Sequence, residues 1–121
     1  MNKILIILFI SFCNLFLITS SVLTEENENK VKIGLLIPLS GENSDIGNQI
    51  VKATRLALKD INSSKLEIFL KDTRSDPNET LKSSIELRDL GVNLVIGPVF
   101  HKNLLYLNQV KDLIFLSFTN K

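Results

Sequence analysis

Four short apolar runs, separated by segments with the pattern of amphipathic helices, constrain the fold of this chain more than any other feature. The runs are VKIGLLIPL from Val31, KLEIFLKD from Lys65, VNLVIGP from Val92 and LIFLSF from Leu113. The first run passes through Pro38 and is followed by the turn-forming cluster SGENSD, which is typical of a strand buried on both faces. Alternation of strand and helix indicates a parallel sheet with right-handed crossovers. The sequence therefore predicts an α/β fold with helices on both faces of the sheet.

Each of the three segments between these runs carries helix signals. Apolar residues recur at spacings of three and four over residues 46–61, as on one face of an amphipathic helix. The second helix is predicted to have Asp76 as its N-cap and Pro77 at its first position, and to end before Gly91 as a left-handed C-cap. The third is expected within VFHKNLLYLNQVKD, where one helical side collects Leu104, Leu107 and Val110. The prediction is thus about four strands and three helices.

The first 21 residues have the organisation of a secretory signal peptide. Lys3 precedes an apolar run over residues 4–18, and small residues follow up to Ser21, after which cleavage is predicted. A retained membrane anchor is the alternative, although the run is shorter than the roughly 20 residues that span a bilayer. Lipidation of Cys13 is disfavoured because Phe12 precedes it and the apolar run continues beyond it. A polar, acidic leader is predicted for residues 22–30, followed by a single partial domain over residues 31–121.

Composition excludes several classes of function for the segment after the signal peptide. This segment has 13 basic residues, which is the 14 of the whole chain minus Lys3, against 13 acidic residues. No large basic surface for nucleic acid or anionic lipid is therefore expected, and membrane contact is expected only through an uncleaved N-terminal segment. Without Cys13 there is no thiol, and the single histidine, His101, has no cysteine partners for a metal cluster.

Catalytic and cofactor motifs are absent from the sequence. No G-x-G-x-x-G follows the first predicted strand, no G-x-x-x-x-G-K-[ST] is present, and no G-x-S-x-G surrounds a serine. Asp72 ends the second predicted strand, where dinucleotide sites have a ribose-binding acid, but without the glycines a turn or helix-entry role explains it better. A flavodoxin-like enzyme would need a phosphate-binding first loop, and SGENSD has a single glycine. We therefore expect a protein that has no cofactor or metal and is not an enzyme.

A binding site is predicted at the carboxyl ends of the strands. In open parallel sheets, ligands bind there, between neighbouring strands whose connections leave toward opposite faces. If the strand order is 2-1-3-4, the first and third strands are neighbours, and the loops that follow them are residues 38–45 and 97–103. Gly41 and Gly97 remove side-chain bulk from these loops and permit close approach. His101 is then either a helix-entry residue or a ligand contact.

Three short motifs occur in order over residues 31–121: I-P-L-S-G after the first strand, D-x-x-x-D-P after the second and I-G-P after the third. Their combination resembles the type I periplasmic ligand-binding proteins, the family of leucine/isoleucine/valine-binding proteins. The resemblance implies a two-lobed protein that closes on a small ligand, with this chain supplying part of the N-terminal lobe. It also implies a periplasmic protein that captures a small polar, amino-acid-like solute for the permease of an ABC-type uptake transporter.

The same resemblance implies which residues contact the ligand. The loop after the first strand matches a cleft-lining loop of the family, and His101 stands where many members have a serine that meets the ligand carboxylate. Ser117 matches a serine in the fourth loop, where Phe118 replaces the proline that follows it in the family. The ligand-binding residues predicted in this way are Ser40, Gly41, Asn43, Ser44, Pro98, Val99, Phe100, His101, Ser117, Thr119 and Asn120.

A sister branch of the same fold offers a second interpretation. PLSG, LVIGPVF and a fourth strand ending LSFTN are also similar to the penicillin-binding protein activators. That resemblance implies a regulator that contacts a cell-wall synthase through an outward surface instead of feeding a transporter. Phe100, Phe118 and the absence of the family's serine at position 101 favour the regulator, whereas the polar residues Ser40, Ser117 and Thr119 modestly favour the solute receptor.

Overall fold

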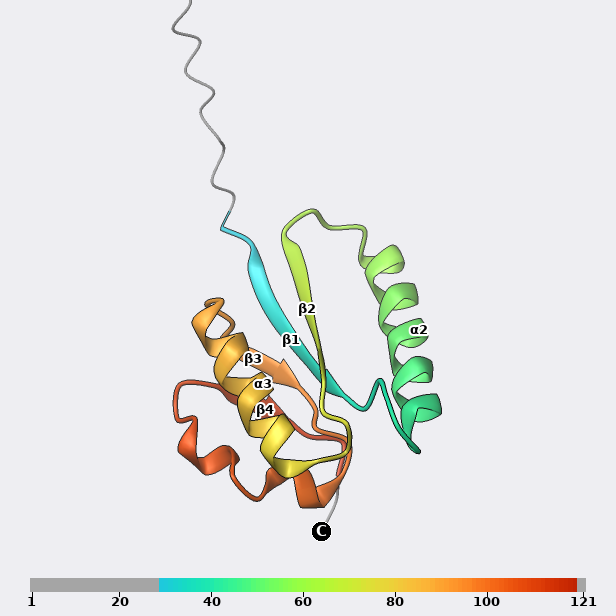
Figure 1. The fold of residues 1–121 in the computed structure, drawn as a ribbon. Helices are drawn as coiled ribbons and strands as arrows, with labels where there is room; N and C mark the ends of the chain where they lie inside the picture. Colours follow the sequence, from blue (N-terminus) through green and yellow to red (C-terminus); the bar gives the residue numbers. More distant parts are fainter. Residues whose placement is uncertain (1–28, 120–121) are drawn as a thin grey trace, which may run out of the picture.

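A computed structural model describes residues 29–119 of the chain, and Figure 1 shows their arrangement. The predicted signal peptide, its cleavage site, most of the acidic leader and Asn120 lie outside the described residues. In chain order the elements are β1 (Val31–Ile37), α2 (Ser44–Ile61), β2 (Leu66–Asp72), α3 (Pro77–Asp89), β3 (Leu94–Ile96), η1 (His101–Leu104), η2 (Leu107–Gln109) and β4 (Ile114–Leu116).

The four strands form one sheet in the order β2-β1-β3-β4. Every neighbouring pair is parallel, with Leu35 of β1 beside Leu70 of β2 and also beside Ile96 of β3. The predicted fold class is therefore confirmed, and the strand order is the one that the site prediction assumed. Because β1 and β3 are neighbours although α2, β2 and α3 separate them in sequence, their loops emerge together at the carboxyl edge of the sheet.

The main hydrophobic core lies between the sheet and α3. Its fully or almost fully buried members come from β1, α3, the connection from α3 to β3, β3 and the segment before β4, namely Leu36, Leu87, Val92, Val95, Val110 and Leu113. Gly34 makes this packing possible, because a Cβ atom built on it would lie 2.8 Å from one methyl group of Leu87. The glycine thus lets α3 approach β1 closely.

Helix α2 lies on the opposite face of the sheet, over β1 and β2 (Figure 1). Its residues Val51, Thr54 and Leu58 line a small hollow that is closed on the other side by Leu35 and the apolar side chains of β2. On the same face, β3 and β4 have no helix over them within the described residues, and Ile114 and Leu116 are exposed. This half of the sheet face is therefore apolar and uncovered.

The predicted ends of the second helix are confirmed. The Asp76 side chain accepts hydrogen bonds from the backbone N–H groups of Asn78 and Glu79, and Pro77 is the first residue of α3. Gly91 follows the helix with φ +79°, and the backbone N–H of Val92 donates to the carbonyl of Leu87. These contacts satisfy backbone groups that every helix end leaves without an intrahelical partner.

The third predicted helix is wrong in type. Residues 99–112 form two short 3-10 helices, η1 and η2, instead of one α-helix. The apolar residues that suggested the helix, Leu104, Leu107 and Val110, follow one another at intervals of three. A 3-10 helix has about three residues per turn, so this spacing suits it better than the 3.6 residues per turn of an α-helix.

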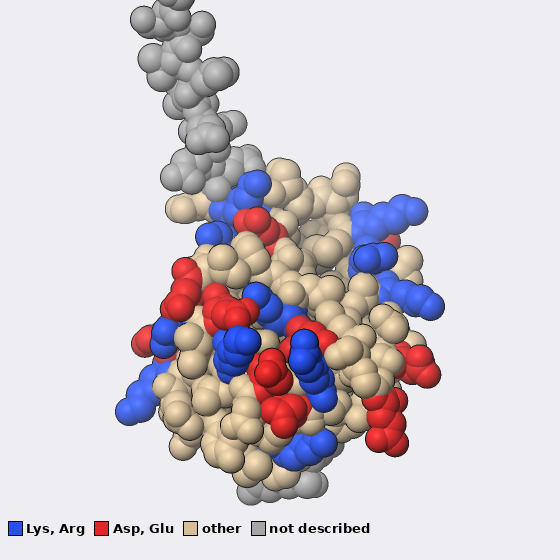
Figure 2. Space-filling view, viewed as in Figure 1, with Lys and Arg blue, Asp and Glu red and all other residues tan. Residues whose placement is uncertain are grey.

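The charged side chains show no large region of one sign on the face that carries α3. Figure 2 shows lysines and arginines interspersed with aspartates and glutamates over that face. One ion pair joins β2 to α3, with the Lys71 ammonium 2.6 Å from the Glu86 carboxylate. Within residues 29–119, no helix is long and apolar enough to cross a membrane.

Candidate ligand-binding site

The loops at the carboxyl edge of the sheet are joined in two pairs by hydrogen bonds. The loops after β1 and β2 form one pair, in which the Asn43 amide donates to the Ser75 hydroxyl over 3.1 Å. The loops after β3 and β4 form the other, in which the Ser117 hydroxyl and the Phe118 backbone N–H both donate to the carbonyl of Pro98. Since β1 and β3 are neighbours, both pairs lie at the same edge of the sheet.

Asp72 holds the first pair of loops together. One carboxylate oxygen accepts from the backbone N–H of Leu39 at 2.8 Å and from that of Arg74 at 2.8 Å. The other accepts from the Ser40 hydroxyl at 2.6 Å. The sequence indicated that Asp72 ends the second strand as a turn or helix-entry residue. In the structure it is the last residue of β2, and its carboxylate fixes the backbone of the predicted ligand loop.

These hydrogen bonds change the acidity of the carboxyl group. Burial raises the pKa of Asp72, but hydrogen bonds from the Ser40 hydroxyl and from the backbone N–H groups of Arg74, Leu39 and Ser40 have the larger combined effect. The pKa of Asp72 therefore lies below its ordinary value. At neutral pH the group is ionised, so it places a negative charge beside the Ser40 end of the site.

Replacing Asp72 with alanine is expected to destabilise the protein by about 1–3 kcal/mol at pH 7, because the Leu39 N–H and the Ser40 hydroxyl lose their acceptor. The depressed pKa adds a pH dependence. The stabilisation is complete above the unfolded-state pKa of about 3.9 and is lost as the pH falls through the lower folded-state pKa. Urea unfolding of both proteins from pH 7 to pH 2 should show their difference in stability shrinking at the acid end.

Asp89 provides the matched control for this prediction. It is an exposed carboxylate that pairs with the adjacent Arg88, so Asp89→Ala is expected to cost less than about 1 kcal/mol. An Asp72→Ala protein no less stable than Asp89→Ala at pH 7 would contradict the anchoring role.

The structure places ten of the eleven predicted ligand-binding residues. Those on exposed surface are Ser40, Gly41, His101 and Ser117, and those that are partly buried are Asn43, Ser44, Val99, Phe100 and Thr119. Pro98 is fully buried and belongs to the frame of the loop, where its carbonyl accepts from Ser117. Asn120 lies outside the described residues.

Two serines of the predicted site, Ser40 and Ser117, donate their hydroxyl protons to acceptors within the protein. Ser40 donates to Asp72, and Ser117 donates to Pro98 while its oxygen also accepts from the backbone N–H of Thr119. In these positions the two serines offer oxygen lone pairs to a ligand and keep their O–H groups for the fold. Hydrogen-bond donors for an anionic ligand group must therefore come from groups other than these two hydroxyls, such as backbone N–H groups, His101 or Lys102.

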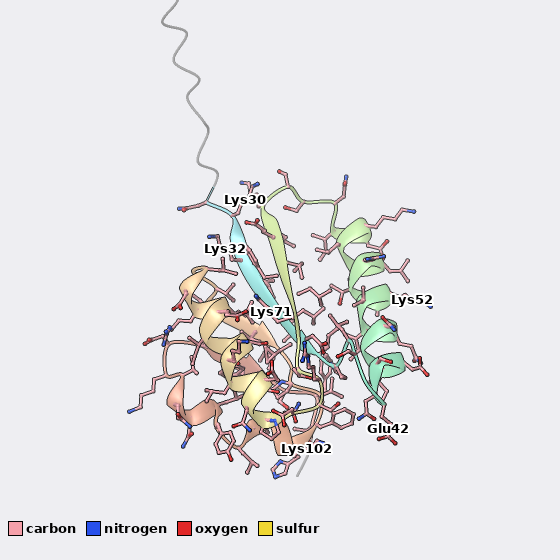
Figure 3. All side chains as sticks on the ribbon, viewed as in Figure 1. Lys30, Lys32, Glu42, Lys52, Lys71 and Lys102 are labelled. Atoms are coloured by element: carbon pink, nitrogen blue, oxygen red, sulfur yellow. The ribbon has the colours of Figure 1, made fainter. Side chains whose placement is uncertain are left out.

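Charged side chains of opposite sign flank the two pairs of loops. Figure 3 shows Glu42, from the loop after β1, and Lys102, from η1, at the end of the molecule opposite Lys30. Asp72 adds a second negative charge on the Glu42 side. The edge therefore presents acidic groups beside the β1 loop and a basic side chain beside the β3 loop.

The sequence pattern did not single out Asn103. This side chain is fully buried in η1, and neither its amide nitrogen nor its carbonyl oxygen has a hydrogen-bond partner among the residues that the structure describes. Asparagine is a common exposed loop residue, so its burial became evident only when η1 packed against α3.

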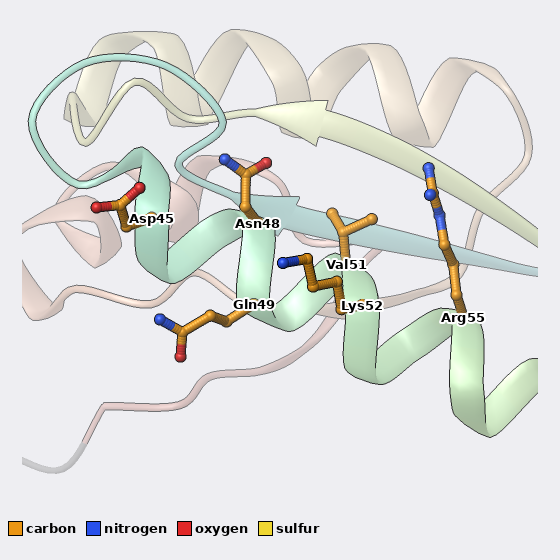
Figure 4. A pocket seen from close by; sticks show the side chains of 6 residues that line it. All are labelled: Asp45, Asn48, Gln49, Val51, Lys52 and Arg55. Carbon is orange, nitrogen blue, oxygen red and sulfur yellow. The ribbon is translucent and has the colours of Figure 1, made fainter.

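A separate hollow lies along α2. Figure 4 shows the side chains that line it, which all belong to this helix, among them Asp45, Asn48 and Arg55. None of the predicted ligand-binding residues lines it. In the part of the chain that the structure describes, no group of three or more histidine, cysteine or acidic side chains is arranged to hold a metal ion.

A sequence relative of this chain is itself uncharacterized. This protein of Methanocaldococcus jannaschii is 29% identical in an alignment over 99 residues that covers 75% of this chain and 24% of the relative. The chain thus spans about a quarter of the length of this protein. The activity and the partners of a whole protein of that length are therefore matters for proposal.

Three solved structures have a similar fold. A solute-binding protein of an ABC transporter from Rhodopseudomonas palustris, in complex with 3,4-dihydroxy benzoic acid, gives a TM-score of 0.69 at 26% identity, over 74% of this chain and 27% of that one. A leucine-binding protein from Thermotoga maritima gives 0.65 at 22% identity, over 72% and 27%. The C-domain of LpoA from Haemophilus influenzae, a regulator of PBP1A, gives 0.63 at 22% identity, over 74% and 28%.

The family assignment rests on a match to a sequence model of a protein family. The sequence model of the periplasmic binding proteins matches residues 30–113, which is more than half of the chain. That span contains β1, β2, β3, α2, α3 and the loops that follow β1, β2 and β3, and it ends just before β4. The chain belongs to the periplasmic binding protein family and has part of its type I α/β fold.

Proposed function

We propose that this chain forms one wall of the ligand cleft in a periplasmic solute-binding protein that serves an ABC-type uptake transporter. The observation that carries the proposal is the meeting of the β1 and β3 loops at one edge of the sheet, with Ser40, Gly41 and His101 exposed there. Parallel α/β sheets bind ligands at this kind of position. Both solute-binding neighbours share the fold that creates it.

The proposed ligand is a small polar molecule that resembles an amino acid. The acidic side of the edge, with Asp72 and Glu42, suits an ammonium or another hydrogen-bond donor. The basic side, with His101 and Lys102, suits a carboxylate. Closure of a second lobe over this edge would then bury the ligand and couple binding to the transporter.

Several features of the chain belong to the same proposal. Residues 1–21 act as a signal peptide, residues 22–30 as a leader and residues 31–121 as part of the N-terminal lobe, which places the protein in the periplasm. The protein is proposed to bind its solute without chemical change. Its partners would be the solute and the transporter permease, and it would need no cofactor.

The double substitution Ser117→Ala with Thr119→Ala tests the assigned ligand contacts. We expect it to weaken binding by about tenfold, because it removes two polar side chains at about 0.5–1.5 kcal/mol each. Isothermal calorimetry with L-leucine and with 3,4-dihydroxybenzoate as probes measures the effect, and circular dichroism checks that the variant is folded.

Ser63→Ala is the control, since Ser63 is an exposed serine at the opposite edge of the sheet, between α2 and β2. Equal affinity of the double variant and this control for a probe that binds would refute the contact assignment. Failure of the unsubstituted protein to bind any small carboxylate would count against solute capture itself.

A second candidate function is regulation of a cell-wall synthase by protein contact. The observation that favours it is the exposure of large apolar side chains, Leu105, Tyr106 and Phe118, on the segments after β3 and β4. LpoA shares the fold. Interferometry against the purified ectodomain of a penicillin-binding protein tests this candidate, and loss of the signal on Phe118→Ser is the expected result.

A further inference from the structure

The sequence contains two triplets of the form Asn-x-Ser/Thr, the pattern at which oligosaccharyltransferases attach a glycan to asparagine. They are NSS, Asn62–Ser64, and NET, Asn78–Thr80. Such a triplet is short and occurs often by chance, so its place in the fold decides whether an enzyme can use it. It must lie on the surface, in a segment that can leave the body of the protein and enter the enzyme.

The first triplet lies in the exposed connection between α2 and β2. Every residue from 61 to 65 is exposed, and none of them belongs to the main hydrophobic core. Asn62 follows α2 with a left-handed backbone, φ 46° and ψ 45°, and its backbone N–H donates to the carbonyl of Leu58. Helix ends fray readily, since their last hydrogen bonds are few and reached by water. This triplet can therefore change conformation without disturbing the core.

The second triplet lies in the first turn of α3, where its threonine is inaccessible. Thr80 is fully buried, and its hydroxyl donates to the carbonyl of Asp76 over 2.7 Å. The backbone N–H groups of Asn78 and Glu79 both donate to the Asp76 side chain. An enzyme could reach the Thr80 hydroxyl only by unwinding the first turn of a helix that packs on the sheet. In the folded protein Asn78 is therefore a poor acceptor, although the residue is exposed.

An aspartate stands two residues before each asparagine, and the two aspartates differ in their surroundings. Asp60 is exposed in the last turn of α2, so it adds a negative charge near Asn62 that a basic group of an enzyme can contact. Asp76 accepts two backbone hydrogen bonds as the N-cap of α3, and Pro77 fixes the backbone before Asn78. Both differences favour Asn62 as the acceptor.

We propose that Asn62 is a site of N-linked glycosylation, by transfer of an oligosaccharide from a polyprenyl-diphosphate carrier. The Nδ2 atom of Asn62 forms a bond to C1 of the first sugar, and the bond from that carbon to the diphosphate oxygen breaks. The amide gives up one proton, and the polyprenyl diphosphate leaves with the bonding electrons. This inference rests on the export proposed for the chain, because N-linked glycans are attached to secreted proteins.

A glycan on Asn62 is compatible with the candidate ligand site. The α2–β2 connection leads into the amino end of β2, whereas the loops after β1 and β3 leave from the carboxyl ends of the parallel strands, at the opposite end of the sheet (Figure 1). A glycan is bulky and solubilising. At Asn62 it would cover the exposed end of α2 and leave the predicted ligand loops open.

The first test treats the purified, folded 121-residue chain with a purified bacterial oligosaccharyltransferase and its lipid-linked oligosaccharide. Intact-mass spectrometry should show a single glycan on the unsubstituted chain and on Asn78→Gln, and no glycan on Asn62→Gln. Circular dichroism checks that both variants are folded. A glycan retained by Asn62→Gln, or an unmodified chain under conditions in which a reference acceptor peptide is fully modified, would overturn the proposal.

Two substitutions at Ser64 separate recognition of the triplet from an effect on the fold. Ser64→Ala removes the hydroxyl that the enzyme requires, whereas Ser64→Thr keeps it. The glycosylated fraction should fall about tenfold or more in Ser64→Ala and stay within about twofold of the unsubstituted chain in Ser64→Thr. Equal modification of these two variants would refute recognition of this triplet.

Expression in cells that carry the same enzyme in the periplasm tests export separately. The unsubstituted chain should carry the glycan in these cells, because export brings Asn62 to the enzyme. A chain that is modified after purification but not in the cells would support the acceptor site and count against the export in the proposed function.

Discussion

Replacing Gly97 with alanine is expected to destabilise the protein by about 3 kcal/mol, because β3 ends in close contact with the backbone of β1. A Cβ atom at this position would lie 2.1 Å from the carbonyl oxygen of Leu36 and 3.0 Å from its carbonyl carbon. Gly97 also has φ +115°, a conformation that residues with a Cβ atom rarely adopt. Backbone strain of about 1–2 kcal/mol and overpacking of about 1–3 kcal/mol then add. Urea unfolding followed by circular dichroism measures the loss.

The substitution Gly41→Ala separates the backbone strain from the overpacking. Gly41 also has positive φ, +79°, but a Cβ atom built on it has no neighbour within 4 Å. Gly41→Ala therefore carries the conformational cost alone, about 1 kcal/mol. If Gly41→Ala and Gly97→Ala lowered the stability equally, the close approach of β3 to β1 would be refuted. Without this close contact between β3 and β1, the ligand loops that follow the two strands would not be held at a fixed distance from each other.

Truncating Leu87 to alanine is expected to cost about 2–5 kcal/mol. This residue of α3 is 0% exposed and lies at the centre of the cluster that joins α3 to β1, β3 and the segments flanking β4. The substitution removes buried methyl groups and leaves a cavity that the rigid sheet fills only in part. Domains of ordinary size are stable by about 5–15 kcal/mol in total, so the variant should unfold at a much lower urea concentration.

Leu56→Ala is the matched control for Leu87→Ala. Leu56→Ala is the same chemical change, also on a helix, but at a site that is 64% exposed. Its truncation is expected to change the stability by less than about 0.5 kcal/mol. A small effect at Leu87, comparable to that at Leu56, would mean that α3 does not pack on the sheet as described.

The elements with strong local signals were predictable from sequence. The apolar run of β1 and the capping residues of α3 each act over a few neighbouring residues, so a local pattern is sufficient to identify them. The segment between β3 and β4 was mispredicted because the spacing of Leu104, Leu107 and Val110 was assigned to an α-helix. Its buried asparagine, Asn103, was missed since burial depends on what packs against η1.

The placement of the candidate loops was predictable from sequence, but their hydrogen bonds were not. Strand order and the rule for open parallel sheets located the loops after β1 and β3 correctly at one edge. A sequence pattern could not predict which acceptor each serine hydroxyl would bind, because the acceptors lie far along the chain. Ser40 donates to Asp72, 32 residues away, and Ser117 donates to Pro98, 19 residues away. The role of each predicted residue in ligand binding stays a prediction.

The sequence by itself determined the class of fold, the order of strands and helices, and the edge at which a ligand site can form. These properties follow from the periodicity of apolar residues and from turn and capping residues, whose effects are local. Only the tertiary structure decided that Asp72 anchors the β1 loop and that Gly97 lets the end of β3 approach the backbone of β1 closely. Each of these depends on contacts between segments distant in sequence, and such contacts exist only after the sheet has assembled.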